Sequence, residues 1–288
     1  MPAALVRRLL LVATLALAAG LAQAAARITI VDGDATLLDG DRSLLAAEGL
    51  ALSAETLVRT GARSTLLRLE WPDGTAADLG PDTQVMVEPG GFPARGGRAP
   101  ALYLLRGWIK LSALSGGSTP GLLTPRVDVQ PFKGALLVMA VGPEHWLFAE
   151  TGDVALAERE AKAAANLSLR NGEVYVRDGA AKGSVAPRPS PAQMQRVPRG
   201  FRDTLPLRLP ALQGRKVEAR AAPAPTYADL REWLVAERAL RRNFTRRFAT
   251  HARTPPFRAG LVENLMQHPE WEPVLFPERF TKPASAPR

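Results

Sequence analysis

The sequence predicts a mainly β fold, a sandwich or roll of many short strands, followed by a helical C-terminal extension. Two patterns predict it. Between residues 27 and 186, short apolar or alternating stretches are separated about every eight to twelve residues by glycine-containing turns. After residue 225, the apolar period lengthens to three or four residues, which is typical of amphipathic helices. Because no such helices separate the strands, a parallel α/β architecture is disfavoured.

The predicted strands begin at Arg27. Residues 27–31 alternate in polarity and end at an Asp-Gly-Asp turn, and residues 65–70 and 75–79 flank Trp71-Pro72-Asp73-Gly74, whose Asp-Gly pair indicates a hairpin. The alanine, lysine and glutamate content of residues 158–165 predicts one helical interruption. Further strands are expected at 35–38, 84–88, 102–105, 108–111, 127–130, 136–141, 146–150, 154–157, 166–170 and 173–177.

Residues 1–24 have the pattern of a secretory signal peptide. Arg7 and Arg8 precede the apolar run Leu9–Gly20, and Ala22-Gln23-Ala24 places small residues where signal peptidase cleaves. We therefore expect export to the periplasm. An uncleaved inner-membrane anchor is the alternative, although the run is short for a membrane span. The chain has no cysteine, so a hydrophobic core without disulfides must stabilise it.

Proline-rich sequence separates the two predicted parts of the chain. The strands of the β domain, residues 27–186, end at the Pro-Arg-Pro-Ser-Pro run, because proline cannot donate a ladder hydrogen bond. A second cluster, Ala-Ala-Pro-Ala-Pro, ends at residue 225. We therefore predict a Pro-rich linker over residues 187–225, a basic amphipathic helical extension over 226–280 and a disordered tail over 281–288.

The extension is expected to begin with one long helix. Thr226 and Asp229 resemble a capping box. Apolar residues between positions 230 and 248 then recur at spacings of three, four and seven, which predicts an amphipathic helix of about six turns. Pro255-Pro256 is expected to end this helical region, with a short further helix over residues 261–267.

Basic charge is concentrated in the same region. The net charge is +9, and residues 199–253 contain 13 Lys or Arg against 5 Asp or Glu. An exported protein rarely meets nucleic acid, so anionic lipid, acidic cell-wall polymer or an acidic protein surface are the compatible partners. The aromatic residues of the helix either pack, on the β domain or on the second helix of the extension, or dock onto a partner groove or a membrane surface. The predicted partner-binding residues are Trp233, Arg241, Arg242, Phe244, Arg246, Arg247 and Phe248.

The sequence contains no motif of a catalytic or metal site, so we expect no enzyme, no cofactor and no metal. The three histidines lack metal-ligand spacing, and neither a G-x-S-x-G elbow nor a phosphate-binding loop occurs. Asp-Gly-Asp turns at 32–34 and 39–41 lack the ligand array of an EF-hand. Glu70 and Asp78, opposite each other across a hairpin, leave open a glycan-active enzyme, although solvated cross-strand acids are the commoner arrangement.

Several turn-and-strand motifs of the β region share a family pattern: Val31–Ala35, Gly49-Leu50, the run LVRTGARSTLLRLEWPDGTAADLGPDTQVMVE from Leu57, Leu104–Lys110, Thr124–Val129 and Phe148–Val154. On these motifs the chain resembles the FecR domain family of bacterial periplasmic proteins over residues 27 to about 177. One departure is that the family's Arg/Lys-Gly-Thr before the last strands reads Lys133-Gly134-Ala135 here.

This resemblance implies a periplasmic, FecR-type β domain used for protein contact. Typical members span the membrane and hold a sigma factor through a cytoplasmic segment; only a few residues precede the apolar run here, so we expect no such segment. The preferred hypothesis is a non-catalytic binding or signalling adaptor that contacts another cell-envelope protein. The alternative is attachment to cell-wall or anionic envelope polymers through the basic region, which would be salt-labile. The oligomeric state stays open.

Overall fold

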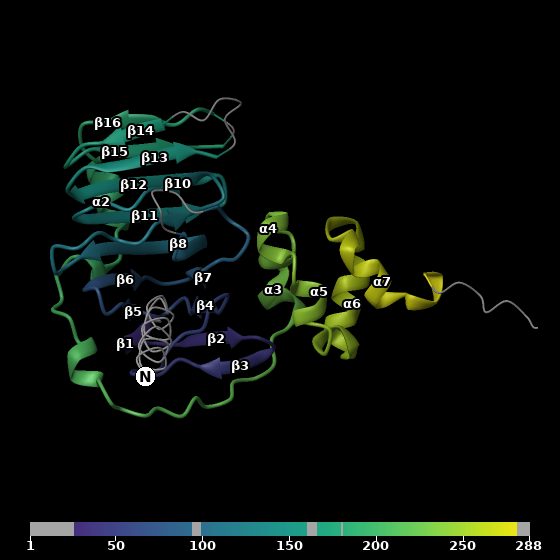
Figure 1. Cartoon of the computed structure of the whole chain (residues 1–288). Coiled ribbons are helices and arrows are strands. Elements are labelled where there is room, and N and C mark those ends of the chain that lie inside the picture. Colours follow the sequence, from purple (N-terminus) through teal and green to yellow (C-terminus); the bar gives the residue numbers. More distant parts are fainter. Residues whose placement is uncertain (1–25, 94–98, 160–165, 180, 281–288) are drawn as a thin grey trace, which may run out of the picture.

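The computed structural model describes residues 26–93, 99–159, 166–179 and 181–280. Its strands run from Arg27 to Ala186 and its helices follow them, so the predicted mainly β fold with a helical extension is confirmed (Figure 1). The predicted signal peptide and tail lie outside the described residues. Residues 160–165 of the helix predicted over 158–165 also lie outside the described residues. Its first residue, Glu158, is the last residue of a strand.

The strands form two sheets that share one long strand. Every pairing is antiparallel except the parallel pair β8–β9. Sheet A contains, in spatial order, β1 (Arg27–Asp32), β5 (Leu66–Glu70), β6 (Thr75–Leu79), β8 (Leu102–Ala113), β11 (Ala135–Val141), β12 (Glu144–Thr151), β15 (Val174–Arg177) and β16 (Ser184–Ala186). Sheet B contains β3 (Arg42–Leu45), β2 (Ala35–Asp39), β4 (Leu57–Thr60), β7 (Gln84–Val87), the start of β8, β9 (Leu122–Leu123), β10 (Val127–Val129), β13 (Val154–Glu158) and β14 (Asn166–Leu169).

Strand β8 passes from sheet B to sheet A at Gly107. Residues before it pair with β7 and β9, and residues from it onward pair with β6 and β11. Gly107 has a φ of +103°, and a Cβ there would lie 2.4 Å from Oγ1 of Thr83. That hydroxyl accepts a hydrogen bond from the Trp108 N–H at 2.9 Å, which holds the bend. The two strands predicted at 102–105 and 108–111 are therefore one bent strand.

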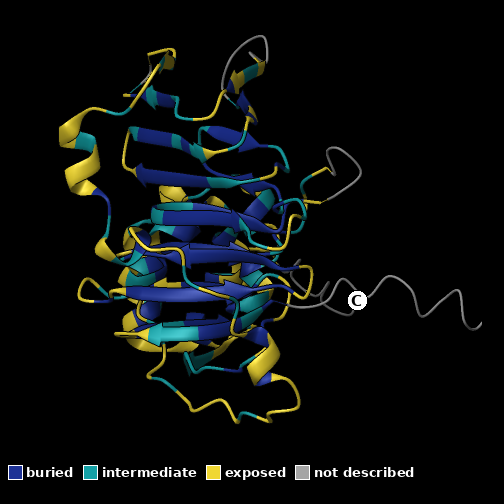
Figure 2. Cartoon of the chain, turned by 90° about the vertical axis from the view of Figure 1, so that its left-hand side faces the viewer, coloured by how far each residue is buried: buried dark blue, intermediate teal, exposed yellow. Residues whose placement is uncertain are grey.

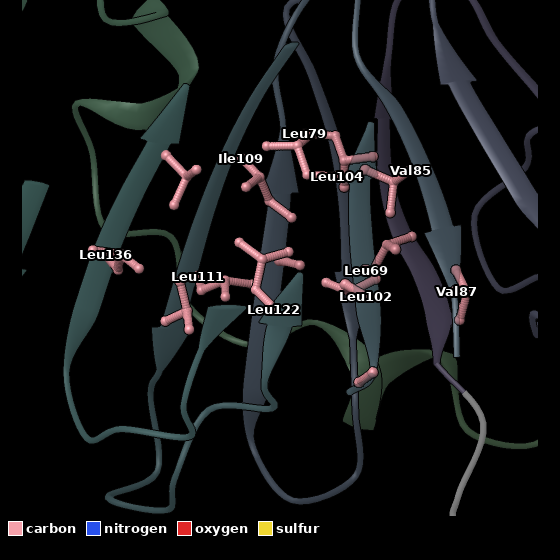
Figure 3. Packing of buried hydrophobic residues seen from close by; sticks show 14 of the residues in the cluster. Leu69, Leu79, Val85, Val87, Leu102, Leu104, Ile109, Leu111, Leu122 and Leu136 are labelled. Carbon is pink, nitrogen blue, oxygen red and sulfur yellow. The ribbon is translucent and has the colours of Figure 1, made fainter. Parts of the chain in front are cut away.

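The main hydrophobic core lies between the two sheets. Leu69, Leu79 and Ile109 of sheet A pack with Val85 and Leu104 of sheet B, and all five are fully buried (Figure 3). Two sheets packed face to face give the sandwich that the strand pattern predicts. Exposed residues are concentrated in the turns and connecting segments (Figure 2).

Residues 187–225, the predicted Pro-rich linker, are called the strap below, and the part from Val197 to Leu209 lies against the outer face of sheet A. The strap contains α2 (Pro191–Arg196) and the 3-10 helices η1 (Arg199–Phe201) and η2 (Leu209–Leu212). Its buried Val197 and Phe201 pack with Leu66, Leu137, Met139, Trp146 and Val174 of the sheet. The strap then runs past β3 to the extension (Figure 1).

The extension, residues 226–280, lies on the side of the strands opposite α2 (Figure 1). None of its helices, and none elsewhere in the described ranges, is long and apolar enough to cross a bilayer. Its elements are α3 (Tyr227–Leu234), α4 (Arg238–Arg241), α5 (Phe244–Arg247), η3 (His251–Arg253), α6 (Pro255–Glu263), η4 (Leu265–Gln267), η5 (Pro269–Trp271), α7 (Glu272–Leu275) and η6 (Pro277–Arg279).

The prediction of one helix from 230 to 248 was wrong. The chain leaves the helix after Leu234, and Glu237 has extended backbone angles (φ −58°, ψ 145°). The Glu237 carboxylate accepts two hydrogen bonds from Arg159 of the β domain, so a tertiary contact holds this break. The prolines at 255 and 256 also begin a helix instead of following one, because the first helical turn needs no N–H donor.

Candidate binding surface on the C-terminal extension

The outer face of sheet B carries two rows of cross-strand neighbours. Residues directly opposite each other on adjacent strands point to the same face, so successive pairs form a row that runs across the sheet. Residues two apart on one strand share that face, so the next row lies two residues along. The apolar row consists of Leu38, Leu57, Met86, Tyr103 and Leu123, each paired with the next. The polar row consists of Thr36, Arg59, Gln84 and Arg106, paired in the same way.

The apolar row is covered by the aromatic residues of the extension. Trp233, Phe244 and Phe248 are 2%, 2% and 0% exposed and belong to one cluster with that row. The rings of Trp233 and Tyr103 lie 6.3 Å apart. Of the two uses considered for this aromatic stripe, the structure shows packing on the β domain, and these three side chains offer no surface to a partner.

The polar row binds two acidic residues of the extension. Asp229 and Glu232 lie one turn apart on α3, and they pair with Arg59 and Arg106, which flank Gln84 in the row. The Arg106–Glu232 distance is 2.9 Å. The two acids, three residues apart on α3, therefore reach two arginines that lie two strands apart in the sheet. This double pairing fixes the direction in which α3 crosses the strands.

Within residues 226–253, acids and arginines consequently point in different directions. Asp229, Glu232 and Glu237 all pair with arginines of the β domain. By contrast, four arginines are exposed and make no ion pair within the described part of the chain: Arg231, Arg238, Arg246 and Arg253. Arg242 is also exposed, with Glu55 at 3.5 Å. The outer surface of α3 to η3 is therefore rich in arginine.

The remaining predicted arginines are structural. Arg247 donates hydrogen bonds to the carbonyl oxygens of Leu38 at 2.6 Å, Gly40 at 2.6 Å and Glu55 at 2.8 Å. Burial lowers the pKa of Arg247. Arg241 pairs with Glu270 inside the extension. Only Arg242 and Arg246 of the seven predicted partner-binding residues are thus exposed.

Three exposed arginines were missed by the sequence reasoning: Arg231, Arg238 and Arg253. They belong to the basic region. The predicted single helix, however, gave no reason to expect these arginines to be exposed and Arg241 and Arg247 to be engaged in contacts. Their exposure follows from the helix breaks and from the pairing of the neighbouring acids. The separation of acids from arginines is therefore a tertiary feature.

The two carboxylates that left an enzyme open are structural groups on the outer face of sheet A. Arg68 donates two hydrogen bonds to Asp78, at 2.6 and 2.8 Å. Glu70 accepts hydrogen bonds from the backbone N–H groups of Arg208 and Leu209 in the strap. Glu70 is 0% and Asp78 2% exposed, so the expectation of solvated acids was wrong. Burial raises the pKa of Asp78, against the effect of Arg68.

Comparisons with known proteins add little to this geometry. No family model and no curated protein matches the chain. Two crystal structures of a protein from Parabacteroides distasonis, provisionally described as an anti-sigma factor, overlap with 46% of this chain and 59% of theirs, at 15% identity and a TM-score of 0.36. An overlap at this TM-score establishes neither a shared fold nor a shared function, so the FecR resemblance stays a prediction.

Proposed function

We propose that the chain is a non-catalytic binding module of the bacterial periplasm, whose extension contacts an acidic surface of another cell-envelope protein. The observation that carries this proposal is the separation of charge in the first part of the extension, residues 226–253. The three acids of this part are used inward, on Arg59, Arg106 and Arg159, while arginines remain outward. Arginine suits carboxylate recognition because its guanidinium donates two parallel hydrogen bonds. The signal-peptide pattern supports the location.

A groove beside α3 favours a protein over a polymer. It has a volume of about 680 Å³ and includes Leu105, Trp108 and the Arg106–Glu232 pair. Two apolar side chains that line it, Val141 and Val235, are 48% and 41% exposed. Protein interfaces combine an apolar centre with a polar rim, and a sugar or phosphate polymer has no need of exposed valines.

Attachment to an anionic polymer is the second candidate, because residues 199–253 carry a net charge of +8 (13 basic minus 5 acidic residues). Such binding would weaken steeply with salt, since exposed charges are screened within about 10 Å at 0.1 M salt. Truncation before Arg199 is a poor test of either candidate. It would remove the extension and most of the strap, which cover both sheets.

The experiment that tests the proposal is site-specific photocrosslinking in intact cells. A photoreactive residue replaces Thr250, which is exposed between Arg246 and Arg253. The matched control replaces Arg170, which is exposed in the turn after β14. We expect a discrete protein adduct from position 250 and none from position 170.

A parallel arm mixes the purified chain with isolated cell walls and with vesicles containing anionic lipid, at low and at high salt. Sedimentation with either, lost at high salt, together with no protein adduct from position 250, would support the polymer candidate and overturn the proposal. Equal adducts from both positions would also overturn it, because the extension would then have no special role.

A further inference from the structure

The groove beside α3 is lined by four separate pieces of the chain. They are the bend of β8 with Leu105–Trp108, the turn before β7 with Pro81 and Asp82, the end of β11 with Val141 and Gly142, and the end of α3 with Glu232, Val235 and Ala236. Its volume of about 680 Å³ exceeds that of any single side chain. The groove therefore has room for a large side chain together with the main chain beside it.

Two valines of this lining are left uncovered because each follows the end of its element. The last residue of β11 that pairs with β8 is Ala140, opposite Gly107, so Val141 pairs with Glu144 of β12 and with no residue of β8. Helix α3 ends at Leu234, and the chain after Val235 turns away. Apolar side chains that are exposed together in one groove mark a contact site, whereas scattered single ones do not.

The charges of the groove differ between its two sides. Arg106 and Glu232 pair with each other, so together they carry no net charge. On the side of the extension, the Arg231 carbonyl accepts a hydrogen bond from the Val235 N–H at 3.2 Å, which places Arg231 one turn before this valine. Arg238 follows Ala236 by two residues. On the side of the sandwich, Asp82 is exposed.

These charges favour an acidic occupant. Arg231 and Arg238 are exposed and make no ion pair with any residue that the structure describes, and neither does Asp82. Two unpaired positive charges thus stand against one negative charge. A basic segment would be attracted by Asp82 alone and repelled by both arginines, whereas an acidic segment is attracted by both on the side of the extension.

We propose that the groove binds a large apolar side chain, aromatic or leucine, from a short acidic segment of the partner. The apolar side chain packs against Val141, Val235 and the half-buried ring of Trp108. The neighbouring acidic residues pair with Arg231 and Arg238. This inference rests on the proposed function, since the segment belongs to the same acidic partner protein, and it names the part of that protein that anchors the contact.

Three pentapeptides with blocked ends are the probes: Glu-Glu-Phe-Glu-Glu, Glu-Glu-Ala-Glu-Glu and Lys-Lys-Phe-Lys-Lys. We titrate the full chain with each and follow the methyl resonances of Val141 and Val235 by NMR. We expect saturable binding of the first peptide. The alanine peptide should bind at least about tenfold more weakly, because it lacks the anchor. The lysine peptide should not saturate.

Two matched variants test the location. Val235→Asp places a carboxylate in the groove and should weaken binding of the phenylalanine peptide by at least about fivefold. Val262→Asp makes the same change in α6 of the extension and should leave binding unchanged; the two valines are 41% and 42% exposed. The unfolding temperature of each variant shows that it is folded, and Val235→Ser replaces Val235→Asp if it is not.

A third variant tests the charge. Arg231→Gln should weaken the phenylalanine peptide by about twofold to fivefold, as expected for the loss of one exposed ion pair. The same variant should leave the weak binding of the lysine peptide no weaker than in the parent.

Three results would overturn the inference: no saturable binding of the phenylalanine peptide, equal affinity for the phenylalanine and alanine peptides, or equal weakening by Val235→Asp and Val262→Asp. Each can be told apart from failure of the proposed function. If position 250 still gives a discrete protein adduct in cells, the partner contact stands and only the anchoring segment is wrong. If that adduct is absent as well, both fail.

Discussion

At the scale of single residues, the most heavily buried charges lie on the outer face of sheet A. The guanidinium of Arg68 is 2% exposed, binds Asp78 through two hydrogen bonds and donates to the carbonyl oxygens of Leu205 and Pro206 in the strap. It thereby connects two strands of sheet A with the segment that covers them. Removing one member of such a pair leaves an uncompensated charge away from water.

We therefore expect Arg68→Leu to lower the free energy of unfolding by about 3–5 kcal/mol. Urea unfolding followed by circular dichroism measures this change. The double variant Arg68→Leu, Asp78→Leu should be more stable than the single variant, because it no longer buries the Asp78 carboxylate without its arginine; Glu70 keeps the backbone N–H groups of Arg208 and Leu209 in both variants. A double variant less stable than Arg68→Leu would contradict this. It would show that the loss in Arg68→Leu does not come from the unpaired Asp78 carboxylate.

A buried histidine makes stability depend on pH. His145 in β12 is 1% exposed, and burial, with smaller effects of Arg126 and Arg177, lowers its pKa from 6.5 to about 4. Between these values the unfolded chain binds the proton and the folded chain does not. The unfolding free energy should therefore fall as the pH drops from 6.5 to 4, by up to about 3 kcal/mol. In His145→Leu this part of the slope should disappear; an unchanged slope between pH 6.5 and 4 would refute the assignment.

At the scale of elements, α3 is the piece that joins the extension to the sandwich. Asp229 has two roles in it: its carboxylate accepts hydrogen bonds from the N–H and hydroxyl of Thr226, and it pairs with Arg59. The capping role does not depend on the sheet, whereas the pairing does. The two contributions can be separated by changing one partner at a time.

We expect Asp229→Ala to lower the unfolding free energy by about 1–2 kcal/mol, because it removes the carboxylate's half of the capping box together with the ion pair. Arg59→Ala removes only a partly exposed pair and should cost less than about 1 kcal/mol. Thermal or urea unfolding of the two variants measures the difference. Equal losses would mean that the hydrogen bonds from Thr226 to the Asp229 carboxylate contribute nothing.

The elements also show where prediction from the sequence ends. Hairpins such as 66–70 with 75–79 were predictable, because alternation and an Asp-Gly turn are local signals. The capping box at Thr226 was local too. The break at Glu237 was not, because Arg159, which holds it, is 78 residues away in the sequence. The exposed set of arginines depends on that break, so the candidate surface was only partly predictable.

At the scale of the whole molecule, the C-terminal region closes the sandwich on both sides. The strap covers the outer face of sheet A through Val197 and Phe201, and the extension covers that of sheet B through Trp233. In that arrangement the inward side of the extension serves stability and its outward side is free to bind. The central claim is that these two roles belong to different residues.

Charge reversal of the outward arginines tests this claim most directly. The variant Arg231→Glu, Arg238→Glu, Arg246→Glu carries a photoreactive residue at position 250, and the yield of its protein adduct in cells is compared with that of the parent. We predict loss of the adduct while the unfolding free energy changes by less than about 0.5 kcal/mol for each substitution, as for surface positions in general. An adduct formed at the parental yield by the folded variant would contradict the account.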